Sequence, residues 1–267
     1  MKDIKDNFSA NNDFPYRSSP PKRVVMFAGT PRSGSTFICQ KFWRTGLLGA
    51  PLEYANDGIN HDLKQNIGDR TFSEYWQDIQ KRRTSPNGIF SFKMFIPILS
   101  RAMQKYHGAI EAFRFDDVVF IYREDIVAQA VSYYRATQTR VWFKTDKEHQ
   151  NISSNIEYDF YRIKKLLQII LQNNKLWERI FISLSVNPHV IKYEDAVRSD
   201  SYIMNIIEEL NLEYSPDYVP NMFSFVMKQG DEINHIWKDR FLYDLNKSGG
   251  YHALLNNDTL PFFLRRG

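Results

Sequence analysis

The stretch from Arg23 to Gly46 constrains the fold of this chain more than any other. Val24–Ala28 is a short apolar run rich in β-forming residues and predicts a buried strand. The turn Gly29–Thr36 reads Gly-Thr-Pro-Arg-Ser-Gly-Ser-Thr, and Ser35–Thr45 predicts a helix that Gly46 ends. This order favours anion binding, because the N–H groups of a first helical turn face the ligand and the helix dipole attracts negative charge.

The loop has the glycine spacing of a P-loop but lacks its lysine. Gly29 and Gly34 occupy the Walker glycine positions, and Ser35 stands where that pattern has lysine. The only cation is Arg32, whose planar guanidinium suits the oxygens of one phosphate or sulfate. The predicted strand ending at Tyr122 also lacks the aspartate that helps to hold magnesium in NTPases. A metal-dependent NTPase is therefore disfavoured. The alternative to an anion-binding loop is a tight turn with a purely structural role.

Strands and helices alternate along the rest of the chain. An α/β fold follows, P-loop-like and three-layered, with a mainly parallel central sheet flanked by helices. In such sheets ligands bind beyond the carboxyl ends of the strands. The 267 residues suit a flexible arm over 1–22 and a single domain over 23–267. The further predicted strands are Ile89–Ile96, Asp117–Tyr122 and His189–Tyr193, and the helices are Phe72–Arg83, Pro97–Tyr106, Asp125–Thr137, Asn155–Ser183, Ser201–Leu210 and Glu232–Leu245.

Composition excludes several classes of protein. With 43% hydrophobic and 25% charged residues the chain is neither disordered nor collagen-like, and a net charge of +4 argues against nucleic acid as the main partner. Cys39 is the single cysteine, which excludes an intrachain disulfide and a thiolate zinc site. The N-terminus has no apolar signal region, and no apolar run approaches the roughly 18 residues of a membrane span. We therefore expect a cytoplasmic protein without an integral membrane segment.

A second anion site is predicted at the end of the third strand. Arg123 follows that strand directly, and Ser132 lies on the next helix about two turns beyond Asp125. A guanidinium and a hydroxyl so placed can hold a second anionic group. Each also has an ordinary alternative: a serine within a helix often bonds back to a carbonyl, and an arginine at a strand end often forms a surface ion pair.

These motifs together carry a resemblance to a known family. Pro31–Thr36 resembles the loop that holds the 5′-phosphosulfate in sulfotransferases using 3′-phosphoadenosine 5′-phosphosulfate (PAPS). Arg123 and Ser132 resemble the residues that hold its 3′-phosphate. Over about 24–245 the chain resembles the trehalose 2-sulfotransferase-like family of bacterial carbohydrate sulfotransferases. That resemblance rests on residues 32–36, 45–46, 51–54, 85–88 with Lys93, 127–132, 134–142 and 228–229.

The resemblance implies transfer of a sulfuryl group from PAPS, in line and without a metal, to a hydroxyl of a carbohydrate or glycolipid. Glu53 is then the general base, and Arg32 also stabilises charge on the departing phosphate. The donor would be bound by Arg32, Ser33, Gly34, Ser35, Thr36, Arg123, Ser132, Lys228 and Gln229. The acceptor pocket would be lined by Ala50, Pro51, Leu52, Glu53, Tyr54 and Ala55.

Several points stay open on the sequence. Lys93 either approaches the same oxygens as Arg32 or is a structural lysine. Candidates for contacts with the adenosine are Gln138, Trp142 and Tyr193. The apolar Ala50 and Leu52 depart from the family's trehalose enzyme, so the acceptor is not identified. The alternative functions are a P-loop nucleotide or sugar kinase and a non-catalytic nucleotide-binding protein of the same fold. The family includes dimers, so a homodimer is compatible with the resemblance.

Overall fold

The computed structural model describes residues 7–57, 63–142, 156–215 and 232–249. Its four strands are β1 (Arg23–Gly29), β2 (Ile89–Phe95), β3 (Asp117–Tyr122) and β4 (His189–Lys192). Its helices are η2 (Ala10–Asn12), α1 (Ser35–Thr45), α2 (Leu63–Ile67), α3 (Phe72–Arg83), α4 (Ile96–Lys105), α5 (Ala109–Ala112), α6 (Ile126–Thr139), α7 (Phe160–Ser183), α8 (Tyr193–Ala196), α9 (Ser201–Glu209) and α10 (Glu232–Lys247).

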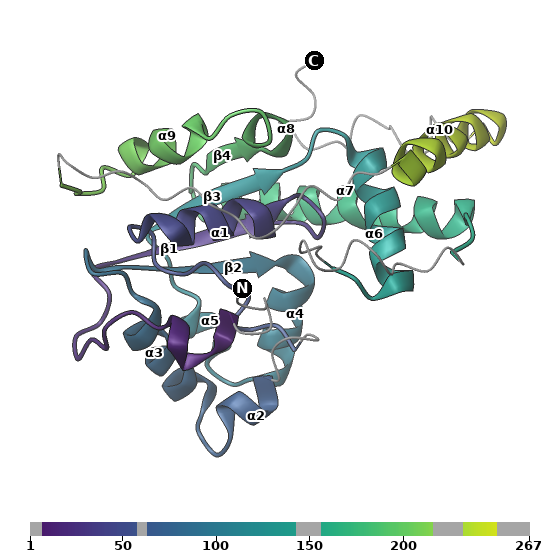
Figure 1. The fold of residues 1–267 in the computed structure, drawn as a ribbon. Helices are drawn as coiled ribbons and strands as arrows, with labels where there is room; N and C mark the ends of the chain where they lie inside the picture. Colours follow the sequence, from purple (N-terminus) through teal and green to yellow (C-terminus); the bar gives the residue numbers. More distant parts are fainter. Residues whose placement is uncertain (1–6, 58–62, 143–155, 216–231, 250–267) are drawn as a thin grey trace. The chain divides into compact units, whose positions relative to one another are not determined.

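The strands form one parallel sheet in the order β2-β1-β3-β4, flanked by helices (Figure 1). This is the P-loop-like α/β fold that the alternation of elements predicts, and the prediction is confirmed. The central strands β1 and β3 are neighbours in the sheet but lie far apart in the sequence, so helices connect them. The carboxyl ends of parallel neighbours meet at one edge, which is where ligands bind in sheets of this kind.

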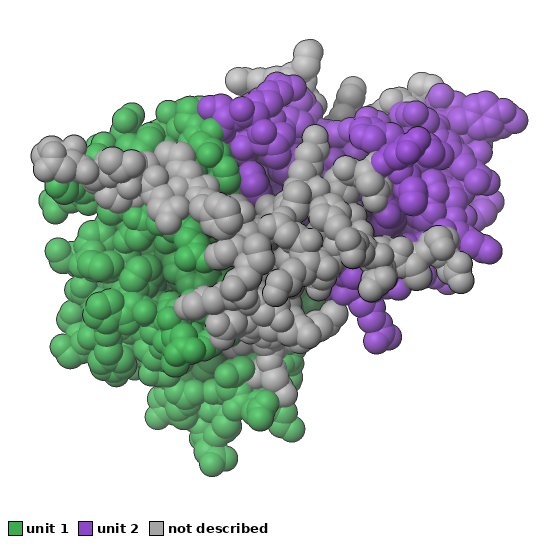
Figure 2. All heavy atoms as spheres, viewed as in Figure 1, with its two compact units in different colours: residues 1–28, 38–120, 200–223 green, residues 29–37, 121–199, 224–267 purple. Residues whose placement is uncertain are grey.

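The chain forms two compact units, which Figure 2 colours separately. Unit 1 comprises residues 1–28, 38–120 and 200–223, and unit 2 comprises residues 29–37, 121–199 and 224–267. Neither unit is one continuous stretch of chain. The division into a flexible arm and a single domain stays a prediction.

The core of unit 1 is built from aromatic rings around β2 and α3. All seven residues of β2 are buried, and Trp76 of α3 lies edge-on to Phe92 and Phe113 at centroid distances of 5.2 and 5.0 Å. The helix begins at a capping box, in which Thr71 and Glu74 each accept a backbone N–H from the other. These side-chain hydrogen bonds fix the residue at which α3 begins. The start of the helix in turn decides that Trp76 faces β2.

Residues 7–22 of unit 1 contact the end of α3. The guanidinium of Arg83, with 1% of the residue exposed, forms an ion pair of 2.8 Å with Asp13 and donates to the carbonyl of Asn7 at 2.9 Å. The N–H of Phe14 donates to the carbonyl of Arg82 at 2.9 Å. A buried arginine needs such acceptors, and this segment supplies them.

The core of unit 2 lies among α6, α7 and α10, which Figure 1 shows side by side. Its buried members come from all three helices, and they include Val131, Tyr134, Ile170 and Phe241. The long helix α7 begins later than its periodicity predicts, because Asp159 caps it by accepting the N–H of Arg162.

Four short helices were not predicted from the sequence: η2, α2, α5 and α8. The predicted strand His189–Tyr193 is one residue too long, since Tyr193 is the first residue of α8. No helix in the described ranges combines the length and the apolar character that crossing a bilayer requires.

Candidate functional site

The loop between β1 and α1 is fixed by two buried side chains of unit 2. The amide of Gln129 on α6 donates to the hydroxyl of Thr30 and to the carbonyl of Pro31, both at 2.8 Å. The indole of Trp177 on α7 donates to the carbonyl of Gly29 at 2.7 Å. Gln129 and Trp177 are both fully buried, so these bonds are shielded from water and hold the loop in one shape.

The conformation of the loop depends on two residues with positive φ. Gly34 has φ of +82°, and a Cβ built there would lie 2.1 Å from the ring of Tyr193, so any side chain at this position must displace that ring. Arg32 has φ of 67°, which is uncommon for a residue with a side chain. Backbone strain of this kind persists only where surrounding contacts impose it, and it concentrates at functional sites.

The loop carries polar groups whose hydrogen-bonding capacity is not met by the described residues. The hydroxyl of Ser33 is fully buried and makes no hydrogen bond to them, a costly arrangement without a partner. Ser35 and Thr36 open α1, where the first N–H groups of a helix have no intrahelical acceptor. Together these donors suit an anion with several oxygens.

Arg32 connects the loop to α6. Its Nε donates to the hydroxyl of Ser132 at 3.1 Å, and its Nη1 donates to the carbonyl of Trp142. Burial, followed by repulsion from Arg123, lowers the pKa of Arg32 to about 10. The side chain is therefore still charged at neutral pH, and the site around it is electropositive.

Ser132 does not bond back to a carbonyl of its own helix. Its oxygen accepts from Arg32, and its own proton has no acceptor among the described residues. Since a hydroxyl can accept and donate at the same time, this proton remains available to a ligand. The two residues that the resemblance gives to different phosphates are thus joined by a direct hydrogen bond.

Arg123 is mostly buried and faces α8. Its guanidinium carbon lies 4.9 Å from the centre of the Tyr193 ring, and its Nε lies 3.8 Å from a carboxylate oxygen of Glu194. The two terminal nitrogens have no hydrogen-bond partner in the part of the chain that the structure describes. The two terminal nitrogens of Arg123 can therefore donate a pair of parallel hydrogen bonds to a phosphate.

Glu53, the predicted base, lies in unit 1 and forms two polar contacts there. Oε1 forms an ion pair of 2.8 Å with Lys93, and Oε2 accepts from the amide of Asn56 at 2.6 Å. The side chain of Lys93 is 5% exposed and that of Glu53 is 22% exposed. Two roles were left open for Lys93. Its ion pair with Glu53, in the same unit, favours the structural role.

The segment around Glu53 is added to the sheet next to β2. Leu52 forms a parallel bridge with Phe92, and the N–H of Lys93 donates to the carbonyl of Leu52 at 2.9 Å. The neighbours of Glu53 are buried, and the Tyr54 hydroxyl donates to the carbonyl of Ala50 at 2.5 Å. These residues hold Glu53 in place, while their contact with an acceptor stays a prediction.

The remaining predicted residues are placed as follows. Lys228 and Gln229 lie outside the described residues. Of the adenosine candidates, Tyr193 is the ring against Gly34, and Trp142 contacts Arg32 through its carbonyl. Gln138 lies instead on the face of α6 that borders a separate cavity.

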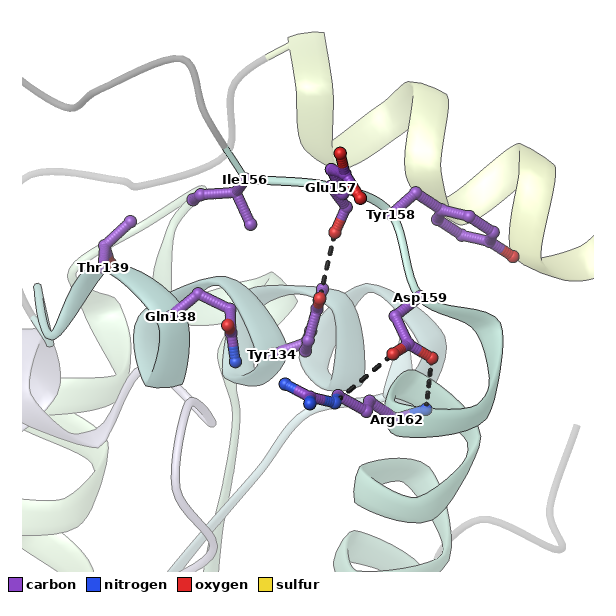
Figure 3. Close-up of a pocket in the computed structure, with 8 residues that line it drawn as sticks. All are labelled: Tyr134, Gln138, Thr139, Ile156, Glu157, Tyr158, Asp159 and Arg162. Carbon is purple, nitrogen blue, oxygen red and sulfur yellow. Dashed lines mark hydrogen bonds and ion pairs between the residues drawn. The ribbon is translucent and has the colours of Figure 1, made fainter.

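That cavity has a volume of about 470 Å³ and lies within unit 2 (Figure 3). It is polar, and two contacts join residues of its lining: the Tyr134 hydroxyl donates to the carbonyl of Glu157 at 2.9 Å, and Arg162 forms an ion pair of 3.3 Å with Asp159. Its lining comes from α6, from residues 156–159 and from α7, and none of the proposed donor-binding residues belongs to it.

Among the residues that the structure describes, no group of three or more His, Cys, Asp or Glu side chains is arranged to hold a metal ion.

Comparison with known proteins gives the class. Residues 24–244 match the family model described as Stf0 sulphotransferase, so the class is that of the sulfotransferases. This chain belongs to the Stf0 sulphotransferase family.

Two relatives are similar to this chain over most of its length. A trehalose 2-sulfotransferase of Mycolicibacterium smegmatis is 24% identical over 271 residues, covering 87% of this chain and 98% of the relative. One of Mycobacterium tuberculosis is 21% identical over 265 residues, covering 85% and 97%. Among solved structures, the sulfotransferase domain of the Synechococcus PCC 7002 olefin synthase matches with a TM-score of 0.45 at 14% identity, covering 89% of this chain and 98% of that domain.

Sequence reasoning missed the residues that support the site. Gln129 is a polar residue in the apolar run Val127-Ala-Gln-Ala-Val131, a local signal for a buried amide with a specific partner. Trp177 falls within the predicted helix Asn155–Ser183, and no sequence pattern assigns a role to Trp177, Asn56 or Glu194. Their roles depend on contacts with distant parts of the chain.

Proposed function

We propose that this protein transfers a sulfuryl group from PAPS to a hydroxyl of a carbohydrate or glycolipid. The observation that carries the proposal is Arg123, a mostly buried guanidinium whose terminal nitrogens have no partner among the described residues. Burial, followed by repulsion from Arg123, lowers the pKa of Arg32, so an anion bound by these side chains relieves part of that cost. Membership of the sulfotransferase family supports the reaction class.

The two anionic ends of PAPS fit two sets of residues in unit 2. The 5′-phosphosulfate is held by residues 32–36, through the first N–H groups of α1, the Ser33 hydroxyl and Arg32. The 3′-phosphate is held by Arg123 and by the free proton of Ser132. The buried, unpartnered Ser33 hydroxyl and the unused donors of Arg123 support this fit. Lys228 and Gln229 are proposed as further donor contacts.

Sulfuryl transfer needs a base for the acceptor and positive charge for the leaving group. PAPS supplies the sulfuryl group: the bond from sulfur to the acceptor oxygen forms while the bond from sulfur to the phosphate oxygen breaks. Glu53 takes the proton that the acceptor hydroxyl loses, since a carboxylate is a competent general base. Arg32 stabilises the negative charge left on the phosphate, and no metal is required for that step.

The acceptor class comes from the relatives. Both are named trehalose 2-sulfotransferases, which supports a sugar hydroxyl as the acceptor here. Residues 50–55 are proposed to face the acceptor, with Glu53 as the member whose side chain is partly exposed. A cytoplasmic location and a homodimer also stay predictions.

The donor is tested by thermal unfolding with 3′-phosphoadenosine 5′-phosphate (PAP) and, separately, with ADP plus magnesium. At about 100 times its dissociation constant a ligand adds roughly 2.7 kcal/mol to the stability of the folded state. In a chain of this size that raises the Tm by roughly 5–10 °C. A shift with PAP alone is expected. A shift with magnesium–ADP alone favours the kinase alternative, and no shift with either refutes nucleotide binding.

The base is tested by Glu53→Gln, with turnover of PAPS measured against trehalose and other sugars. The variant keeps the shape and one acceptor oxygen but removes the carboxylate and its ion pair with Lys93, so we expect turnover to fall by about 10²-fold or more while PAP binding is unchanged. Asp57→Asn is the matched control, because Asp57 is an exposed carboxylate of the same segment that pairs with Lys105 at 2.7 Å. Full turnover in Glu53→Gln refutes the assignment.

A further inference from the structure

Glu194 fills the turn between β3 and α6. The strands β3 and β4 are neighbours, so the first residues after each meet at one edge of the sheet. The two carboxylate oxygens of Glu194, from α8, accept the N–H groups of Glu124 at 3.1 Å and of Asp125 at 3.2 Å. The same carboxylate lies 3.8 Å from Nε of Arg123.

Arg123 is thereby held on two sides by one four-residue helix. The ring of Tyr193 lies against the face of the guanidinium, with 4.9 Å between the guanidinium carbon and the ring centre. Glu194 attracts the Nε edge, and the terminal nitrogens remain on the opposite edge without partners among the described residues. An anion is therefore excluded from the Nε edge and directed to the terminal nitrogens.

Capping of α6 does not account for Glu194. Asp125 already caps this helix by accepting the N–H of Ala128 at 3.0 Å, and its other oxygen accepts from Lys238 at 2.6 Å. The contacts of Glu194 are with the residues just before the helix, next to Arg123. A carboxylate there fixes the backbone that carries the arginine and the orientation of its side chain together.

We propose that Glu194 is the positioning residue of the 3′-phosphate site, acting through Arg123. This inference rests on the proposed function, because it assumes that Arg123 holds that phosphate. Removing Glu194 frees the turn, and the guanidinium must then be ordered at the moment of binding, which weakens the contact with the 3′-phosphate. Contacts with the 5′-phosphate do not involve Arg123 and are unaffected.

The experiment measures the dissociation constants of PAP and of adenosine 5′-phosphate (AMP) by calorimetry, since the two ligands differ only in the 3′-phosphate. In Glu194→Ala we expect the preference for PAP over AMP to fall by about tenfold, which is 1.4 kcal/mol, with the affinity for AMP unchanged. Asp195→Ala is the matched control. It removes a charge from the same helix, but Asp195 is exposed and pairs with Lys192 and Arg198, so the preference should stay as in the unmodified protein.

The outcomes separate the two proposals. An unmodified protein that does not prefer PAP over AMP refutes the proposed donor site itself. If the unmodified protein prefers PAP and Glu194→Ala keeps or raises that preference, Glu194 is not a positioning residue. Equal loss of both ligands also refutes the inference, because a general structural defect weakens both. Should Glu194→Ala fail to fold, Glu194→Gln, which keeps one acceptor for the turn, is measured in its place with a smaller fall expected.

Discussion

Gly34→Ala tests whether the loop and α8 form one packed unit. The substitution adds a single methyl group at a residue whose φ is +82° and whose Cβ would lie 2.1 Å from the Tyr193 ring. Left-handed backbone costs an alanine about 1–2 kcal/mol. Forcing the ring aside adds about 1–3 kcal/mol, the usual cost of an extra methylene in a filled core.

The total of about 2–5 kcal/mol should lower the Tm by roughly 5–15 °C in a chain of this length. Gly46→Ala separates the two contributions, because Gly46 has φ of +71° and nothing within 4 Å of its Cβ. That control meets only the backbone cost and should lose roughly 2–6 °C. Calorimetric unfolding of both variants is the assay.

The reasoning is refuted if Gly34→Ala is no less stable than Gly46→Ala. A second check is the double variant Gly34→Ala with Tyr193→Ala. Since the ring is the obstacle, the two losses should be clearly less than additive. PAP affinity should fall in Gly34→Ala and stay unchanged in Gly46→Ala.

Three further variants follow from the same contacts. Trp177→Phe should cost about 1 kcal/mol more than Trp76→Phe in urea unfolding, because Trp177 donates to a loop carbonyl. The similarly buried Trp76 indole has no hydrogen-bond partner among the described residues, so equal losses would contradict this reasoning. Lys93→Met should destabilise the protein by about 1–2 kcal/mol, and Lys93→Met with Glu53→Gln should recover most of it, since the loss comes from an unpaired, partly buried carboxylate. Burial raises the pKa of the Cys39 thiol from 9.0 to about 12, so stability should fall as pH rises from about 9 towards 12, where only the unfolded chain releases the proton; Cys39→Ala should flatten that part of the stability profile.

The sequence predicted elements best where local signals mark both ends. The helices Ser35–Thr45 and Phe72–Arg83 were predicted to the residue, because a capping box opens the second and Gly46, with its positive φ, follows the first. The short helix α8 was not predicted, since four residues are too few for a periodicity to show. Tyr193 therefore extended the predicted strand β4 by one residue.

The residues of the candidate site also differ in how well the sequence predicts them. Arg32, Arg123 and Ser132 could be proposed because they lie on segments that follow strands of a parallel sheet, a rule that depends only on topology. The partners of Gln129 and Trp177 could not be predicted, because they are a hydroxyl and two carbonyls in a loop far from them in sequence. The apolar neighbours of Gln129 indicate that its amide is buried, but the packing of the helices decides which loop atoms it contacts.

The loop between β1 and α1 contacts side chains that lie far from it in the sequence, and this affects how the protein folds during synthesis. Gln129 lies 98 and 99 residues from its two partners, Ser132 lies 100 from Arg32, and Trp177 lies 148 from Gly29. The strand–loop–helix motif is therefore complete on the ribosome long before the side chains that shape it exist. Contacts so distant are slow to form, since the intervening chain must be closed into a loop first. A nascent chain acquires the final shape of this loop only late, after α7 has been made.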